Sequence, residues 1–174
     1  VSTKHLRKMT SNQGSRMRQD WDARARADAR HYIATREGGR DTGDFYERGR
    51  IQSYRLSKEP FERLGFDPIG KRVLEIGCGT GRLFPGFAEM FGEIYGIDVP
   101  KEMIERGREE CPVKGVHFIL GSGRDLAGLD DQFFDYCFSY IVFQHIPSKD
   151  IVWDYLTETY RVLKPGGMFQ LHFS

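Results

Sequence analysis

The 174-residue sequence has no run that approaches the roughly 20 consecutive apolar residues of a membrane-spanning helix. Its first 20 residues are mostly polar and lack the apolar segment of a secretory signal peptide. These two absences lead us to expect a cytoplasmic protein. Apolar residues still make up 39% of the chain and charged ones 29%, which is typical of a folded globular domain.

Cysteine is scarce, since Cys78, Cys111 and Cys137 are the only three and no two form a Cys-x-x-Cys pair. An odd number without paired spacing indicates reduced, partly buried thiols rather than a disulfide framework. The five histidines are scattered without the spacing of metal ligands. We therefore expect no protein-bound metal.

Net charge is almost absent at +1, but its distribution along the chain is uneven. Residues 1–40 contain 10 lysines and arginines against 4 acidic residues, whereas the remainder contains 16 against 21. A basic arm of this kind can bind nucleic acid. In residues 20–30, however, acidic residues alternate with arginines at helical spacing, which is typical of a solvated helix face. We expect no nucleic-acid partner.

The N-terminal third contains a polar leader followed by two helical patterns. Residues 1–18 show no periodicity and predict a flexible leader. Residues 21–36 and 45–64 are amphipathic, and we expect Pro60 to divide the second helix. Residues 19–66 thus predict a helical extension, whose aromatic side chains either form a lid over a ligand or pack against the rest of the domain.

Beyond residue 66, apolar runs of strand length alternate with amphipathic segments. The apolar runs cover residues 72–76, 93–97, 116–120, 133–141 and 167–173. The helical patterns cover residues 82–91, 101–110 and 149–163, the last of which we expect to end at Pro165-Gly166-Gly167. Apolar strands that alternate with helices predict a parallel sheet covered on both faces. Residues 67–174 therefore predict an α/β, doubly wound domain.

The last predicted strand, residues 167–173, has no helix after it in the sequence. An apolar strand at the edge of a sheet is seldom left bare. We expect a second copy of the chain, as in a homodimer, or a further segment to cover this edge. The predicted domain is in that sense C-terminally incomplete.

The segment VLEIGCGTGRL, residues 73–83, places Gly77, Gly79 and Gly81 directly after an apolar run. Glycine costs backbone entropy, so three within five positions indicate that another group must approach the backbone closely. A strand, a glycine turn and a helix in succession place backbone N–H groups at the carboxyl end of a parallel sheet, where ligands bind. The alternative is a tight turn without a ligand.

The glycine motif differs from common phosphate-binding patterns. A dinucleotide fingerprint requires glycine where Arg82 stands, and the Gly-Lys-Ser/Thr sequence of a P-loop is absent. Asp98 follows the next apolar run, 17 positions after Gly81, and a carboxylate there can accept both hydroxyls of a ribose. An adenosine-containing ligand without a pyrophosphate fits these features better than a dinucleotide.

VLEIGCGTGRL and IYGIDVPKEMI resemble the first two motifs of class I S-adenosylmethionine-dependent methyltransferases. FDYCFSYIVFQHIP and RVLKPGGMF resemble the fourth- and fifth-strand motifs of this superfamily, in the same order and spacing. The resemblance covers residues 70–173 and is closest to methyltransferases of ubiquinone and menaquinone biosynthesis. It implies a Rossmann-like sheet without its last two strands, S-adenosyl-L-methionine as cofactor and S-adenosyl-L-homocysteine as product.

The resemblance also implies the residues of a cofactor site. Those around the methionine part and the methyl group would be Glu75, Gly77, Cys78, Gly79, Gly81, Ser139 and Tyr140. Asp98 would bind the ribose hydroxyls, and Val99 would pack on the adenine. Ser122 stands where the family has an aspartate that meets the adenine amino group, while Gly123 offers its backbone N–H.

The cofactor's sulfonium makes the methyl group electrophilic, so a protein of this family mainly positions two reactants for an in-line displacement. His145, after the fourth predicted strand, is the candidate general base, because imidazole accepts a proton near neutral pH. The alternative is a histidine that only packs in its loop.

The expected class of methyl acceptor depends on motifs that the sequence lacks. No Asn-Pro-Pro-Tyr motif follows the fourth predicted strand, and Cys111-Pro112 is misplaced for a nucleophile that attacks cytosine. We therefore expect methyl transfer to a small molecule. The alternatives are an RNA or protein acceptor, a non-catalytic protein that binds S-adenosylmethionine or a nucleoside, and a nucleotide-dependent oxidoreductase.

Overall fold

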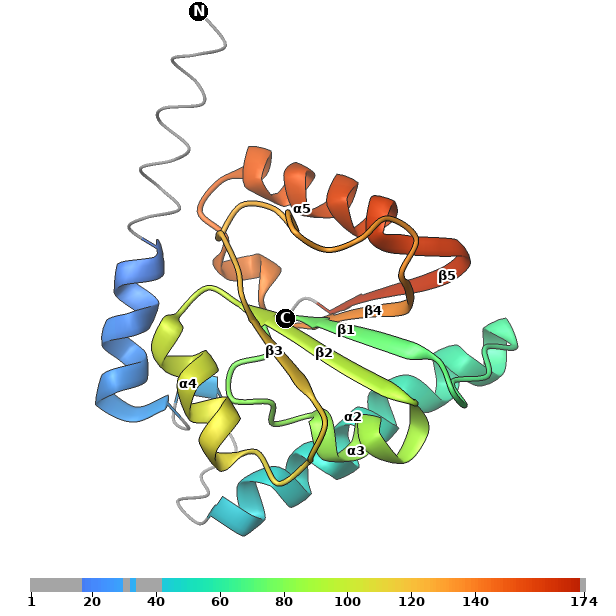
Figure 1. Cartoon of the computed structure of the whole chain (residues 1–174), viewed down its shortest axis with the longest axis horizontal. Coiled ribbons are helices and arrows are strands. Elements are labelled where there is room, and N and C mark those ends of the chain that lie inside the picture. Colours follow the sequence, from blue (N-terminus) through green and yellow to red (C-terminus); the bar gives the residue numbers. More distant parts are fainter. Residues whose placement is uncertain (1–16, 30–31, 34–41, 173–174) are drawn as a thin grey trace, which may run out of the picture.

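The computed structural model describes residues 17–29, 32–33 and 42–172, and residues 17–29 form a helix. The elements that follow are α2 (Thr42–Leu64), β1 (Arg72–Ile76), α3 (Phe84–Met90), β2 (Glu93–Asp98), α4 (Lys101–Glu110), β3 (His117–Leu120), β4 (Phe134–Tyr140), the 3-10 helix η1 (Phe143–His145), α5 (Lys149–Val162) and β5 (Leu163–His172). Figure 1 shows the strands in one twisted sheet with helices on both sides.

The strands lie in the order β3-β2-β1-β4-β5, and every neighbouring pair is parallel. The chain extends from β1 to β2 and β3 on one side, then crosses to β4 and β5 on the other. Open α/β sheets bind ligands at such a reversal, outside the carboxyl ends of the strands. The arrangement confirms the predicted α/β, doubly wound parallel sheet.

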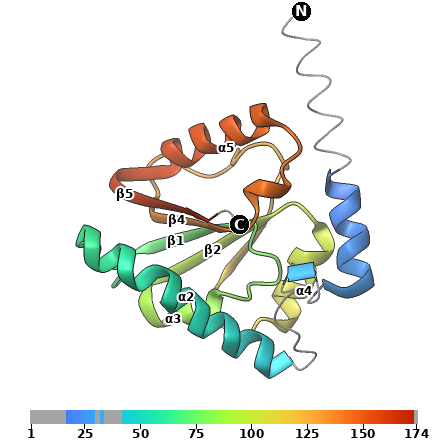
Figure 2. The ribbon, with the colours of Figure 1, turned by 180° about the vertical axis from the view of Figure 1, so that it is seen from behind.

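Two apolar clusters cover the two faces of this sheet. In β1, Val73 belongs to the cluster shared with α2, α3 and α4, whereas Leu74 and Ile76 belong to the cluster shared with α5. Figures 1 and 2 show α5 on one face and α2 with α3 on the other. Because both faces are covered, the strands carry the near-continuous apolar runs seen in the sequence.

The prediction that Pro60 divides the second helix is wrong, because α2 continues from Thr42 to Leu64. A proline inside a helix leaves the carbonyl four residues earlier without its usual donor. Here that carbonyl belongs to Leu56, and Gln170 of β5 supplies a donor, since its Nε2 lies 2.9 Å from the Leu56 oxygen. A side chain 114 positions away thus compensates for the proline.

The N-terminal helix begins earlier than the sequence predicts. Residues 17 and 18, which we assigned to a flexible leader, are its first described residues. Residues 1–16 of that leader lie outside the described residues. So do residues 30–31 and 34–36 of the predicted helix. Ala25 and Ala29 pack against Met103 of α4, and the two helices lie side by side in Figures 1 and 2.

Four strands match the predicted runs to within one residue at each end, and β5 differs. Leu163, the residue after α5, has an extended backbone and already pairs with Phe134 of β4. The register then shifts, so that residues 165–167, which we expected to end the helix, lie in an irregular part of β5. β5 is the last strand of the sheet order. That a second copy or a further segment covers it stays a prediction.

Candidate functional site

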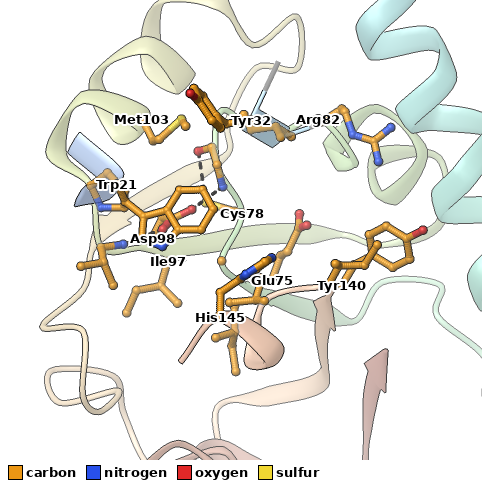
Figure 3. A pocket seen from close by; sticks show the side chains of 18 of the residues that line it. Trp21, Tyr32, Glu75, Cys78, Arg82, Ile97, Asp98, Met103, Tyr140 and His145 are labelled. Carbon is orange, nitrogen blue, oxygen red and sulfur yellow. Dashed lines mark hydrogen bonds between the residues drawn. The ribbon is translucent and has the colours of Figure 1, made fainter. Parts of the chain in front are cut away.

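A cavity of about 560 Å³ opens at the carboxyl ends of β1, β2 and β4, where Figure 3 shows its lining side chains. Its volume lies within the range of about 300–1,000 Å³ that is usual for small-molecule sites. The polar and aromatic side chains that line it include Trp21, Gln52, Glu75, Arg82, Asp98, Tyr140, His145 and His172.

The turn between β1 and α3 forms one wall of the cavity. Gly77 and Gly79 have φ angles of 79° and 55°, in the left-handed region that favours glycine. A Cβ at Gly77 would lie 2.3 Å from Cγ2 of Val142, and one at Gly79 would lie 2.9 Å from Cδ1 of Ile33. Glycine therefore lets neighbouring side chains approach this turn while its backbone faces the cavity.

Gly81 belongs to the same motif but does not line the cavity. A Cβ there would lie 2.7 Å from Cδ2 of Phe84 and 2.9 Å from Cζ of Phe118. Both rings belong to the apolar cluster on the α2, α3 and α4 face. Glycine at this position is thus required by the packing of the turn on the core.

Asp98 ends β2 and links it to the glycine turn. Its Oδ2 accepts the Gly79 N–H at 2.6 Å, and its Oδ1 accepts the Val99 N–H at 2.7 Å. Burial raises the pKa of Asp98 to about 6, although these two hydrogen bonds oppose the rise. A carboxylate oxygen can accept more than one hydrogen bond, so Asp98 can also accept hydroxyl groups from the cavity.

Glu75 of β1 is a buried carboxylate at the cavity, with 4% of its surface exposed. Its Oε2 has no hydrogen-bond partner among the described residues. Burial raises the pKa of Glu75 well above its usual value, an effect that the Arg82 charge opposes and the Asp98 charge reinforces. A buried acceptor without a donor is costly, so this carboxylate is suited to a cationic or N–H-bearing ligand group.

Three polar side chains, linked by hydrogen bonds, lie at the same end of the cavity as Glu75. Arg82, which is 5% exposed, donates to Oε1 of Gln52, and Nε2 of Gln52 donates to the Tyr140 hydroxyl at 2.8 Å. The Tyr140 ring packs against His172 with a centroid separation of 4.9 Å. Gln52, Arg82 and His172 were not among the predicted site residues. No local pattern identifies Gln52, because α2 precedes β1 and reaches the cavity only through tertiary packing.

The N-terminal helix lines the cavity on the side of Asp98, beside which Figure 3 shows Trp21. Nη2 of Arg18 donates to the Gly121 oxygen after β3 at 2.8 Å. Trp21 lines the cavity and meets the His145 ring edge to face, with a centroid separation of 5.6 Å. Trp21 thus both lines the cavity and packs against η1, and that the extension forms a lid over a ligand stays a prediction.

His145 lies at the end of η1 and lines the cavity. Its Nε2 is 3.5 Å from Nε2 of Gln144, and it packs against Trp21 as described above. Burial and the Arg24 charge lower the pKa of His145. A lowered pKa keeps the imidazole neutral at physiological pH, which is the form that accepts a proton.

Besides Gly81, three of the predicted residues are engaged outside the cavity. Ser139 is buried, and its Oγ donates to the Ile76 oxygen at 2.9 Å, which ties β4 to β1. Ser122 is exposed, and its Oγ lies 2.6 Å from Oδ1 of Asp125. Gly123 packs beside Val99, whose Cγ1 would lie 3.3 Å from an added Cβ. The predicted residues that do line the cavity are Glu75, Gly77, Cys78, Gly79, Asp98, Val99, Tyr140 and His145.

In the part of the chain that the structure describes, no group of three or more His, Cys, Asp or Glu residues is placed to hold a metal ion. None of the helices in those residues is both long and apolar enough to cross a membrane.

Cys78, Cys111 and Cys137 are free and buried, as expected for reduced thiols. Burial raises the pKa of each thiol, which makes them weak nucleophiles at neutral pH.

The sequence profile of a family described as a methyltransferase domain matches residues 74–171. The fatty-acid O-methyltransferase of Mycolicibacterium smegmatis is 35% identical over 105 residues, which are 59% of this chain and 37% of that protein. The demethylmenaquinone methyltransferase of Geobacillus kaustophilus is 34% identical over 108 residues, which are 57% of this chain and 43% of that protein. The chain thus spans less than half the length of these curated relatives.

A solved structure shares the fold over nearly all of this chain. The phosphoethanolamine N-methyltransferase 1 of Haemonchus contortus, in complex with phosphoethanolamine and S-adenosylhomocysteine, superimposes with a TM-score of 0.71 at 20% identity. The match covers 93% of this chain and 32% of that chain. At this identity the likeness concerns the fold alone.

Proposed function

We propose a function on the premise that the chain belongs to the methyltransferase-domain family of the class I S-adenosylmethionine-dependent methyltransferases. The chain binds S-adenosyl-L-methionine in the cavity at the carboxyl ends of β1 and β2 and transfers the methyl group to a small molecule. The observation that carries this proposal is the pair of carboxylates beside the glycine turn, the buried Glu75 and the half-buried Asp98, which both line the cavity.

The cavity's chemistry fits the parts of this cofactor. Asp98 would accept the ribose hydroxyls, as acidic residues at the end of the second strand do in related folds. Val99 and Met103 would provide apolar contacts for the adenine beyond it. Glu75 would accept a hydrogen bond from the ammonium of the amino-acid end. This bond would give a donor to its Oε2, which has no partner among the described residues. The turn at Gly77 and Gly79 would pass beneath the ligand.

The chain's own contribution to methyl transfer is positioning. The bound cofactor supplies an electrophilic methyl group on a sulfonium, and a displacement then requires an acceptor in line with the breaking bond. Trp21, His145 and Tyr140 would contact that acceptor from the N-terminal helix, η1 and β4. His145 would remove a proton where the acceptor carries one, because its imidazole lines the cavity and its lowered pKa keeps it in the neutral form that can accept a proton.

A small-molecule acceptor is supported by the size of the cavity and by the names of the relatives, which act on a fatty acid and on demethylmenaquinone. The proposal is tested with S-adenosylmethionine carrying a tritiated methyl group. Acceptor panels should contain fatty acids, quinols and phosphorylated amines in one arm, and RNA and proteins in the other. We expect label only in the small-molecule arm, and label only in RNA or protein would contradict the proposal.

The affinity for 5′-methylthioadenosine should decrease as the pH is lowered through about 6. An ionised Asp98 accepts ribose hydroxyls, and its pKa of about 6 means that binding must displace a proton below that pH. We expect a constant affinity above pH 7 and a decrease of about tenfold per pH unit below 6. Calorimetry from pH 8 to pH 5 measures this. This ligand lacks the amino-acid end, so titration of Glu75 contributes little, and a flat profile would exclude Asp98 as the acceptor.

A further inference from the structure

A second histidine lines the cavity and has no role in the function proposed above. His172 is the last residue of β5, and it lines the cavity together with Tyr140 of β4 and His145 of η1. No residue that the structure describes forms a hydrogen bond or an ion pair with the His172 imidazole. Its two nitrogens are therefore available to a ligand in the cavity.

The position of this imidazole is determined by Tyr140. The two residues are partners in the parallel register of β4 and β5, and their rings pack with 4.9 Å between centroids and an interplanar angle of 31°. Tyr140 is in turn bound to α2, because Nε2 of Gln52 donates to its hydroxyl at 2.8 Å. Ring packing uses a face of the imidazole, whereas the nitrogens stand at its edge. The contact with Tyr140 thus orients the imidazole without occupying its hydrogen-bonding groups.

The backbone beside this pair of rings is strained. Ile141, which follows Tyr140, has a φ angle of 57°, in the left-handed region that β-branched residues rarely adopt. Its N–H donates to the His172 oxygen at 3.0 Å, and Ile141 also lines the cavity. Strain of this kind persists where the surrounding structure imposes it, and it is concentrated at ligand sites. The turn at Ile141 therefore joins the ends of β4 and β5 at the cavity and leads directly into η1.

His172 lies beyond the groups that the cofactor would use. Asp98 ends β2 and Glu75 belongs to β1, whereas His172 ends β5, which is the last strand of the order β3-β2-β1-β4-β5. Neighbouring strands lie about 4.8 Å apart, so the ends of β2 and β5 are separated by about 14 Å across the sheet. Figure 3 shows Asp98, Glu75 and Tyr140 in this order across the cavity. The β5 side of the cavity is thus the side on which an acceptor can lie next to the cofactor.

We propose that His172 binds the methyl acceptor through a hydrogen bond of its imidazole, oriented by the packing on Tyr140 and by the turn at Ile141. This inference rests on the proposed function. It adds an acceptor-binding residue that neither the glycine motif nor the resemblance to methyltransferases supplied. Because an imidazole both donates and accepts, the acceptor carries an oxygen or nitrogen group on the β5 side. The alternative is that His172 only packs against Tyr140.

Two substitutions separate hydrogen bonding from packing. His172→Phe keeps a flat ring against Tyr140 and removes both nitrogens, whereas His172→Gln keeps a hydrogen-bonding group and removes the ring. If the imidazole binds the acceptor, His172→Phe is the more damaging change. If the imidazole only packs, His172→Gln is the more damaging one.

The probes are octanoate, hydroquinone and phosphoethanolamine, one from each class of the small-molecule panel. For each probe that accepts the tritiated methyl group, KM is measured for the probe and for S-adenosylmethionine. We expect His172→Phe to raise the KM of the probe about 10-fold and that of S-adenosylmethionine less than about threefold. His172→Gln should raise the KM of the probe only a few fold.

His117→Phe is the matched control. His117 packs on Tyr95 with a centroid separation of 4.3 Å and does not line the cavity. This substitution should change neither KM. Calorimetry with S-adenosyl-L-homocysteine, whose affinity should stay within about threefold in all three variants, shows that the cofactor site is intact.

Binding without turnover is followed by nuclear magnetic resonance. Each probe is added to the complex of the chain with S-adenosyl-L-homocysteine, and the imidazole signals of His172 are assigned by their loss in His172→Gln. We expect at least one probe to shift these signals. The measurement applies equally if none of the three probes is labelled.

Three results would overturn the inference and leave methyl transfer standing. They are an unchanged KM of every labelled probe in His172→Phe, a larger loss in His172→Gln than in His172→Phe, and spectra in which no probe shifts the His172 signals. A folded chain that neither binds S-adenosyl-L-homocysteine nor labels any acceptor would overturn the proposed function and this inference together.

Discussion

Asp98→Ala is expected to weaken the binding of S-adenosyl-L-homocysteine by at least about 100-fold, because it removes a charged acceptor for two ribose hydroxyls. The change also leaves the N–H groups of Gly79 and Val99 without the oxygens that now accept them at 2.6 and 2.7 Å. The turn that lines the cavity then loses its link to β2. Isothermal titration calorimetry with the full chain measures the effect.

Two companion variants separate the lost contacts from a lost fold. Asp98→Asn keeps the shape of the side chain and one acceptor oxygen, so we expect a smaller loss of affinity than for Asp98→Ala. Asp130→Ala removes an exposed carboxylate that does not line the cavity and should leave affinity unchanged. An Asp98→Ala variant that is folded and binds within about threefold of the unmodified chain would place the ribose elsewhere.

Glu75→Gln is expected to stabilise the ligand-free protein while it weakens S-adenosyl-L-homocysteine by about 10- to 100-fold. Oε2 of Glu75 is buried without a partner among the described residues, and a neutral amide avoids the cost of burying that charge. We expect the free energy of unfolding to increase by about 1–3 kcal/mol at pH 8. The affinity decreases because the amide no longer attracts the ammonium of the ligand. Urea unfolding and calorimetry on the same samples measure the two effects.

The gain in stability should depend on pH. Burial raises the pKa of Glu75 in the folded protein above its value in the unfolded chain, so the folded state binds the proton more tightly. Ionised Glu75 therefore destabilises the fold above its folded pKa, and protonation removes that cost as the pH falls toward 4.5. The advantage of Glu75→Gln should be largest at pH 8 and smaller at pH 5. Glu109→Gln, at an exposed position of α4, provides the control and should show neither effect.

Local sequence patterns were sufficient to predict the sheet and the position of Asp98 beside the glycine turn. The run at residues 72–76, the glycines after it and Asp98 at the end of the next run are close in sequence, and each obeys a local rule of strand or turn chemistry. Because parallel neighbours bring their carboxyl ends together, Asp98 meets the turn at Gly79 as soon as β1 and β2 pair.

Long-range packing explains what the sequence did not predict. Gln52 reaches Arg82 because α2 packs directly against the turn after β1, a contact that no periodicity in α2 encodes. The same holds for Gln170, whose hydrogen bond to Leu56 lets α2 continue through Pro60.

The assignments of Ser122 and Ser139 came from the resemblance alone, and neither side chain faces the cavity. Ser139 instead bonds the Ile76 oxygen, and Ser122 bonds Asp125 within its own loop. A resemblance predicts where the chain passes a ligand, but the local hydrogen bonds decide which way each hydroxyl points.

The central claim is that the cavity between the glycine turn, Asp98 and Glu75 is the cofactor site. A crystal structure of the chain with S-adenosyl-L-homocysteine tests it most directly. We expect the ribose hydroxyls within hydrogen-bond distance of Asp98, and the amino-acid end beside Glu75. Density for the ligand outside this cavity, or a fully occupied ligand whose ribose does not contact Asp98, would contradict the account.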